Sequence, residues 1–149
     1  MYNKTMEFEY NTLDVQTFEE VYTSVGWPAL NREQVEAALQ NSYLSIVCKD
    51  QGKAVGIIRI IGDGSLAFFI KNFVVIPEYQ SKGVGKQLLE KAEEYIRNSL
   101  PEDWSYIIEL ISSTTAEGFY EKMGYDKCPH GFEGPGMYKM SYGKNESSV

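Results

Sequence analysis

The feature that most constrains the fold is an apolar strand that runs through a proline and a glycine-rich turn directly into a long helix. The strand pattern covers Leu66–Ile76 and ends at Pro77, and the helix pattern begins at Val84. Gly83 and Gly85 stand at that junction. A helix N-terminus leaves backbone N–H groups unpaired and carries about half a positive charge, while glycine lets the backbone approach a ligand closely. The junction therefore favours an anion, and a diphosphate is the expected guest.

Hydrophobic periodicity predicts further strands and helices on both sides of this junction. Strands are predicted at Met6–Tyr10, Tyr43–Lys49, Ala54–Ile61, Trp104–Ile111 and Met137–Tyr142, and helices at Val15–Val25, Arg32–Gln40, residues 84–98 and Thr115–Met123. Asn31 is a typical N-cap for the second helix, and Pro101 ends the long third one. The order is roughly βααβββαβαβ, which predicts a layered α/β (α+β) domain with one sheet covered by helices.

Length and charge limit the classes of protein to consider. With 149 residues we expect a single domain over residues 1–142 and a flexible polar tail over 143–149. The net charge of −7 argues against a nucleic-acid partner, and apolar runs such as Ala67–Ile70 are too short to span a membrane. Cys48 and Cys128 form neither a disulfide framework nor a zinc quartet. Mostly buried thiols and a cytoplasmic location are the expectation.

The spacing around the two glycines discriminates between known phosphate loops. A Walker loop requires a Lys-Ser or Lys-Thr pair after its last glycine, and the dinucleotide fingerprint requires a third glycine near Leu88; the chain has neither. The observed pattern is Gln80-x-x-Gly83-x-Gly85 after an apolar strand and a proline.

This pattern resembles the acetyl-CoA motif of the GNAT superfamily of N-acetyltransferases. The segments Glu117–Tyr125 and Gly134–Tyr138 are also similar to family sequences, and the resemblance covers most of Tyr43–Tyr142. It implies a mixed, mostly antiparallel central sheet of roughly six to seven strands, flanked by about four helices and splayed between the fourth and fifth strands. It is also compatible with a homodimer, because members often pair through late strands.

The resemblance implies acetyl-CoA as the co-substrate and no metal. The loop amides that would bind its pyrophosphate belong to Ser81, Lys82, Gly83, Val84, Gly85 and Lys86, after Gln80 opens the loop. The pantetheine arm would pair with the strand end Phe73-Val74-Val75 like an added β-strand. Ser113 stands where the family often has an asparagine that contacts pantetheine.

Acetyl transfer to an amine needs a donor for the carbonyl oxygen and a proton for the departing thiolate. By resemblance, the backbone N–H near Val75 supplies the first and Tyr120 acts as the general acid. Glu109 is the candidate base, through water. Asp63, which suits its tight turn for backbone reasons, the loop residue His130 and ordered water remain alternatives.

The resemblance predicts a small molecule or a peptide with a primary amine as the acceptor. Trp27, Lys71 and Asn72 are the candidate acceptor residues, between walls at Tyr22–Leu30 and Cys128–Gly136. Two other interpretations remain open: a non-catalytic acyl-CoA-binding sensor or scaffold, and a nucleotide-phosphate binder of unrelated fold that uses the glycines as a plain anion loop.

Overall fold

The computed structural model describes residues 6–144, and the chain divides into two compact units, residues 1–110 and 111–149. The single domain expected over residues 1–142 stays a prediction, and residues 145–149 of the expected tail lie outside the described residues.

The first unit is built on a mixed, mostly antiparallel sheet. Its strands are β1 (Met6–Tyr10), β2 (Leu44–Asp50), β3 (Lys53–Gly62), β4 (Ala67–Ile70), β5 (Val74–Val75) and β6 (Ile107–Glu109). Their order is β1-β2-β3-β4-β6, and β5 also pairs with β3. Only the pairing of β4 with β6 is parallel among the described strands. The predicted sheet is confirmed, with six strands.

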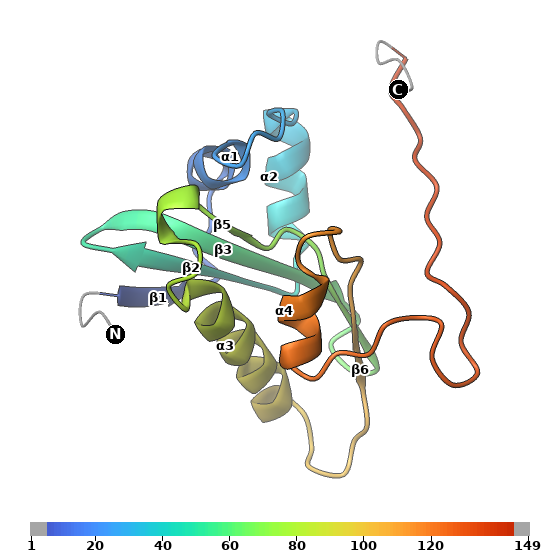
Figure 1. The fold of residues 1–149 in the computed structure, drawn as a ribbon. Helices are drawn as coiled ribbons and strands as arrows, with labels where there is room; N and C mark the ends of the chain where they lie inside the picture. Colours follow the sequence, from blue (N-terminus) through green and yellow to red (C-terminus); the bar gives the residue numbers. More distant parts are fainter. Residues whose placement is uncertain (1–5, 145–149) are drawn as a thin grey trace. The chain divides into compact units, whose positions relative to one another are not determined.

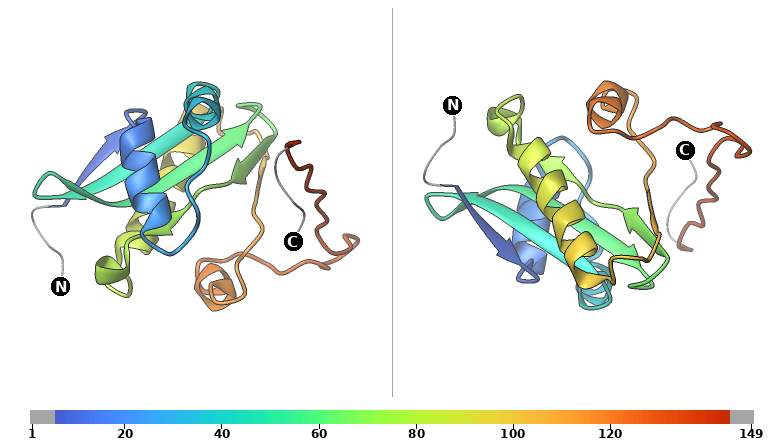
Figure 2. Two further views of the ribbon diagram at one scale, coloured as in Figure 1. Left: turned by 90° about the horizontal axis from the view of Figure 1, so that it is seen from above. Right: turned by 90° about the horizontal axis from the view of Figure 1, so that it is seen from below.

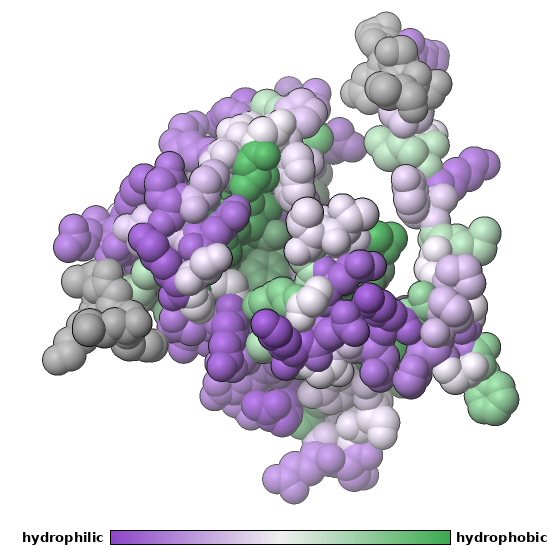
Figure 3. All heavy atoms as spheres, in the orientation of Figure 1, coloured by the Kyte–Doolittle hydropathy of each residue, from purple (hydrophilic) through white to green (hydrophobic). Residues whose placement is uncertain are grey.

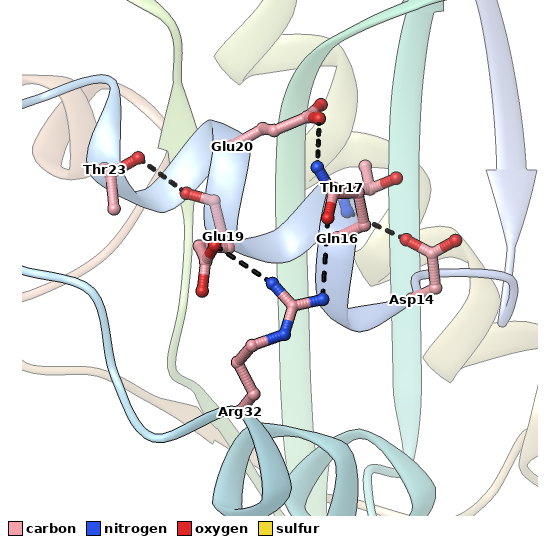
Figure 4. A network of polar contacts seen from close by, with 7 residues as sticks. All are labelled: Asp14, Gln16, Thr17, Glu19, Glu20, Thr23 and Arg32. Atoms are coloured by element: carbon pink, nitrogen blue, oxygen red, sulfur yellow. Dashed lines mark hydrogen bonds and ion pairs between the residues drawn. The ribbon is translucent and has the colours of Figure 1, made fainter.

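Three helices cover the two faces of this sheet. Helices α1 (Val15–Thr23) and α2 (Arg32–Gln40) lie on one face and α3 (Val84–Ser99) on the other, as the views from above and below show (Figures 1 and 2). The Arg32 Nη1 lies 3.0 Å from Glu19 Oε1 and thereby ties the start of α2 to α1 (Figure 4). The helices therefore flank the sheet as predicted.

The core lies between the sheet and these helices. Every described apolar side chain classed as buried falls between Leu13 and Ile96, and β2 and β3 contribute most of the fully buried ones. Gly56 on β3 lets α3 approach closely, because a Cβ there would lie 2.9 Å from Leu88 and 3.0 Å from Val84. The sheet face around Gly56 is thus the one that α3 covers.

The strand predicted as one run over Leu66–Ile76 is two strands, β4 and β5, which is a correction. Pairing moves from Ile60–Ile70 to Ile57–Val74, so one extra residue is inserted between the two registers. This is a β-bulge at the polar Lys71-Asn72 pair. Strand β6 pairs only with β4, so the sheet opens beyond the bulge, where the resemblance predicts the splay.

The described part of the second unit carries one helix, α4 (Glu117–Lys122), and Gly124 after it has a left-handed backbone with φ 91°. The strand predicted at Met137–Tyr142 is wrong: these residues form no strand. Met137 and Tyr138 are 90% and 82% exposed, and apolar groups are visible along this part of the chain in Figure 3. An alternating pattern becomes a strand only when a neighbour takes up its backbone N–H and C=O groups.

The two cysteines differ in their surroundings. Cys48 is buried in β2, as expected, and burial raises the pKa of its thiol to about 11. Cys128 is exposed, which corrects the expectation of two mostly buried thiols, because it lies in a loop outside the core. Among the described residues no helix is long and apolar enough to cross a bilayer.

Candidate functional site

The loop between β5 and α3 has the backbone geometry of an anion site. It begins with the short 3-10 helix η1 (Pro77–Tyr79), and the backbone then turns left-handed twice, at Ser81 (φ 62°) and at Gly83 (φ 83°). Alternation of right- and left-handed residues turns successive amides toward one concave side. A Cβ added at Gly83 would meet nothing nearer than Gln87 Nε2 at 3.9 Å, so the loop is open at this point.

The N-terminus of α3 is not capped by a side chain. Asp14 caps α1 by accepting from the Thr17 N–H at 2.8 Å, and Asn31 caps α2 by accepting from the Gln34 N–H at 3.0 Å. Gly83 occupies the same position of α3 and has no side chain to do so, and the first turn of α3 contains no acidic residue. The first amides of α3 are therefore directed at solvent or a ligand.

Two lysines add positive charge to this loop. The Lys82 Nζ lies 5.3 Å from the centre of the Tyr79 ring, and the Lys86 Nζ lies 3.9 Å from Glu90 Oε1, with both lysines exposed. Tyr79 is itself fixed, because its hydroxyl donates to Asp50 Oδ2 at 2.6 Å. That hydrogen bond also raises the pKa of Tyr79. The loop is therefore anchored to β2 and is positive in a chain of net charge −7.

Beside this loop, β5 has an outer edge that faces away from β3. The Ile76 N–H donates to Val55 O at 3.0 Å and the Arg59 N–H donates to Asn72 O at 3.1 Å. The backbone N–H and C=O groups of successive residues in a strand point to opposite edges. Those of residues 72, 74 and 76 therefore point toward β3, and those of Phe73 and Val75 point toward the other edge. Among the described strands β5 pairs with β3 alone. Gln80 Nε2 donates to Val75 O at 2.9 Å, so the loop reaches this edge.

The candidate acceptor residues of the first unit lie in different places. Lys71 and Asn72 form the bulge, and Lys71 is exposed with its Nζ 5.8 Å from the centre of the Phe69 ring. Trp27 follows α1, is 44% exposed and lies 5.0 Å from the Tyr22 ring, centre to centre.

The two carboxylates considered as bases also differ. Asp63 accepts three backbone hydrogen bonds through Oδ1, from Ser65, Leu66 and Ala67, and these lower its pKa. Its turn role is thereby confirmed. Glu109 is the last residue of β6 and is exposed.

Arg59 carries no sequence pattern that would mark it as a functional residue. It sits on β3 opposite the bulge, where Arg59 Nε donates to Asn72 Oδ1 at 2.7 Å. One arginine within an apolar strand has no periodicity or spacing that marks it, and its partners come from other parts of the chain. Only the charge in an otherwise apolar run was available as a signal.

The remaining candidates lie in the second unit. Tyr120 is half-buried on α4, and its ring centre lies 5.2 Å from that of Phe119 and 5.8 Å from that of Tyr125. Burial raises the pKa of Tyr120, so its hydroxyl keeps its proton at neutral pH. Ser113 Oγ lies 3.4 Å from Thr115 Oγ1, and His130 is exposed.

The structure therefore brings the predicted cofactor residues 73–86 together in one strand–loop–helix segment of the first unit, and Ser113 and Tyr120 belong to the second. Within residues 6–144 no three histidine, cysteine, aspartate or glutamate side chains are grouped so that they could hold a metal ion.

Solved structures share this fold. A probable acetyltransferase from meticillin-resistant Staphylococcus aureus superposes with a TM-score of 0.80 at 26% identity, covering 91% of this chain and 99% of that one. A GNAT family acetyltransferase from Streptococcus pneumoniae does so with a TM-score of 0.76 at 25% identity, covering 91% and 98%. The fold expected from the resemblance is confirmed.

Curated proteins are similar in sequence. A histone acetyltransferase of Glycine max is 31% identical over 137 residues, which are 85% of this chain and 58% of that protein. A chloroplastic serotonin N-acetyltransferase of Oryza sativa subsp. japonica is 27% identical over 131 residues, 85% of this chain and 64% of that protein. This chain thus spans a little over half the length of such relatives.

The family model described as an acetyltransferase (GNAT) domain matches residues 9–144, which include the loop, strand β5 and Tyr120. The chain therefore belongs to the GNAT family of acetyltransferases.

Proposed function

We propose that this protein transfers the acetyl group of acetyl-CoA to the primary amine of a small molecule or peptide, by direct attack of the amine while both substrates are bound. The observation that carries the proposal is the uncapped N-terminus of α3 beside the single-partner strand β5. The uncapped helix N-terminus suits a diphosphate, and the edge of β5 suits an amide-containing chain.

The loop residues fit the diphosphate. Backbone amides from Ser81 to Lys86 would bind its oxygens, because the left-handed backbone at Ser81 and Gly83 turns them inward and no acidic residue in the first turn of α3 competes. Lys82 and Lys86 add charge at the rim. Gln80 would hold the loop against the strand end through its hydrogen bond to Val75 O.

The strand edge fits the rest of the donor. Acetyl-CoA supplies an activated acetyl group as a thioester at the end of an arm that contains amides. The edge at Val75 faces away from β3, and an arm with amides adds to such an edge as another strand does. The Val75 N–H would then stabilise negative charge on the carbonyl oxygen, as a fixed donor does in acyl transfer.

Tyr120 is the proposed general acid for the departing sulfur. Its raised pKa keeps the phenol protonated at the pH where the amine attacks, which is the form that an acid must have. Glu109 and ordered water remain the proposed proton acceptors. The proposed assignments of Ser113 to the arm and of Trp27 to the acceptor rest on the resemblance, and that of Lys71 and Asn72 to the acceptor rests on their interruption of the apolar strand. A homodimer and a cytoplasmic location stay predictions.

The test is acetyl-CoA-dependent thiol release with a panel of primary amines, run together with calorimetric binding of coenzyme A. The proposal predicts binding and amine-dependent release. Binding without release for any amine would favour the non-catalytic acyl-CoA module instead, and the absence of binding would overturn the proposal.

The proposed role of Tyr120 is tested by Tyr120→Phe, with Tyr138→Phe as the control because Tyr138 is 82% exposed in the same unit. We expect kcat to fall at least about tenfold with little change in coenzyme A affinity. A kcat within about twofold of the wild type across roughly pH 7–9, where an unperturbed tyrosine stays protonated, would remove Tyr120 from the mechanism.

A further inference from the structure

Arg59 is a half-buried cation whose described side-chain partners are neutral. Its Nε donates to Asn72 Oδ1 at 2.7 Å, and its Nη1 donates to Ser42 Oγ at 3.2 Å. Ser42 follows α2 and Asn72 belongs to the bulge, so the guanidinium joins three segments on the sheet face that α1 and α2 cover. A guanidinium has five N–H donors, so several remain for another acceptor.

No carboxylate among residues 6–144 forms an ion pair with Arg59. Burial lowers the pKa of its guanidinium, and no acidic neighbour counters that effect. Arg32, also an arginine on this side of the sheet, is bound to Glu19 at 3.0 Å. Charges removed from water are normally paired, so the lack of an acid at Arg59 points to an anion that is not part of the described chain.

The bulge places a second cation beside the first. The Lys71 N–H donates to Arg59 O at 2.9 Å and the Arg59 N–H donates to Asn72 O, so Lys71 and Asn72 both lie opposite Arg59. Lys71 shares a sheet face with Phe69, over whose ring its Nζ lies, and it forms no ion pair within the described residues. Two residues with cationic side chains and no acidic partner among the described residues thus lie opposite each other on neighbouring strands, in a chain with 21 acidic and 14 basic residues.

We propose that Arg59, assisted by Lys71, binds a carboxylate on the acceptor, so that the acceptor is an amine that also carries a carboxylate. This inference rests on the proposed function. The planar fork of a guanidinium matches a carboxylate with two parallel hydrogen bonds. Lys71 contributes as a mobile point charge at the exposed rim, and the hydrogen bond from Nε to Asn72 holds the fork in place.

The position of the cations indicates which amines to use as probes. Asn72 precedes Val75 by three residues, about 10 Å along an extended strand. If Arg59 binds the carboxylate, the reacting amine should therefore be separated from the carboxylate by several bonds and should not be an α-amine. Suitable pairs are 6-aminohexanoate against hexylamine, and lysine against 1,5-diaminopentane, because each pair differs by one carboxylate.

The experiment measures KM and kcat for each pair, and thermal stabilisation by each amine in the presence of coenzyme A. For the wild type we expect the carboxylate member to have a KM at least about tenfold lower, as for a lost charge-assisted hydrogen-bonded pair. Arg59→Gln is expected to remove that preference, so that the KM values of the two members of each pair fall within about threefold of each other.

Lys71→Gln is the second variant, because Lys71 is exposed and its replacement does not threaten folding. We expect it to reduce the preference about threefold, as for an exposed charge pair. Lys53→Gln is the matched control. It removes an exposed cation from β3, the strand that carries Arg59, and we expect it to leave the preference for the carboxylate member unchanged.

The outcomes separate this inference from the proposed function. Equal KM and equal stabilisation for both members of each pair overturn the inference, even if acetyl transfer proceeds. A preference that Arg59→Gln and Lys71→Gln both leave unchanged also overturns it, and then Arg59 serves only to hold the bulge. Failure to bind coenzyme A would instead overturn the proposed function itself.

Discussion

Helices α1 and α3 begin in opposite ways although both pack on the same sheet. Asp14 closes the N-terminus of α1 with its own carboxylate, and Gly83 leaves that of α3 open. A closed end adds to stability because its amides are satisfied within the chain. An open end gives up that contribution and keeps the amides for an anion from outside. This difference supports the proposal that the open end of α3 binds the donor.

The largest effect is expected from blocking the open end with Gly83→Glu. The side chain would place a carboxylate where the diphosphate is proposed to bind, and the left-handed φ of 83° adds strain. We expect coenzyme A affinity to fall at least about 100-fold, the loss of roughly two charge-assisted hydrogen bonds, as measured by calorimetry.

Gly52→Glu is the control for that variant. Gly52 has nearly the same φ, 81°, and open space around it, so the two variants share the backbone strain and the charge change. It lies in the turn between β2 and β3, outside the segment that joins β5 to α3. If both variants lost affinity equally, the open end would have no special role.

Much of the first unit is predictable because its signals are local. Asn31 marks the start of α2, and the bounds Arg32–Gln40 and Met6–Tyr10 are those observed. The glycine loop is also predictable, since its geometry comes from its own residues. Elements that depend on a distant partner are not: the bulge at Lys71 and Asn72 is visible only from its pairing with β3.

The errors and omissions have the same physical origin. Met137–Tyr142 alternates as a strand does, but alternation does not supply the neighbouring strand that its backbone needs. Arg59 stands out only through its partners Ser42 and Asn72, which lie 17 and 13 residues away. Sequence patterns therefore identify residues whose role depends on their own segment. They miss residues whose role depends on contacts with residues that are distant in the sequence.

An intermediate effect is expected from opening the closed end with Asp14→Ala. Loss of the cap should lower the free energy of unfolding by about 1 kcal/mol at neutral pH, with coenzyme A affinity unchanged. Denaturant unfolding measures the first quantity and calorimetry the second. A change in affinity as large as that of Gly83→Glu would erase the distinction between the two ends.

The pH dependence sharpens this prediction. The hydrogen bond from the Thr17 N–H lowers the pKa of Asp14 in the folded chain. A lowered pKa gives stability that is present above the unfolded pKa of about 3.9 and is lost as the pH falls through the folded value. The stability gap between wild type and Asp14→Ala should therefore shrink as the pH falls below about 4. A gap that stays constant down to the lowest pH would contradict the capping role.

The smallest effect is expected from Ser81→Gly. Ser81 holds a left-handed φ of 62°, which glycine adopts without strain, but glycine also loses more backbone entropy on folding. We expect a gain in unfolding free energy of about 0.5 kcal/mol and an unchanged coenzyme A affinity. A loss of stability would show that the serine side chain has a role of its own in the loop.

The central claim, that the open N-terminus of α3 holds the diphosphate of the donor, is tested most directly by calorimetric titration of the wild type with coenzyme A and with pantetheine, which has no diphosphate. The account predicts that coenzyme A binds at least about 100-fold more tightly and that Gly83→Glu abolishes this difference. Equal affinities for the two compounds, or a difference that Gly83→Glu leaves intact, would contradict it.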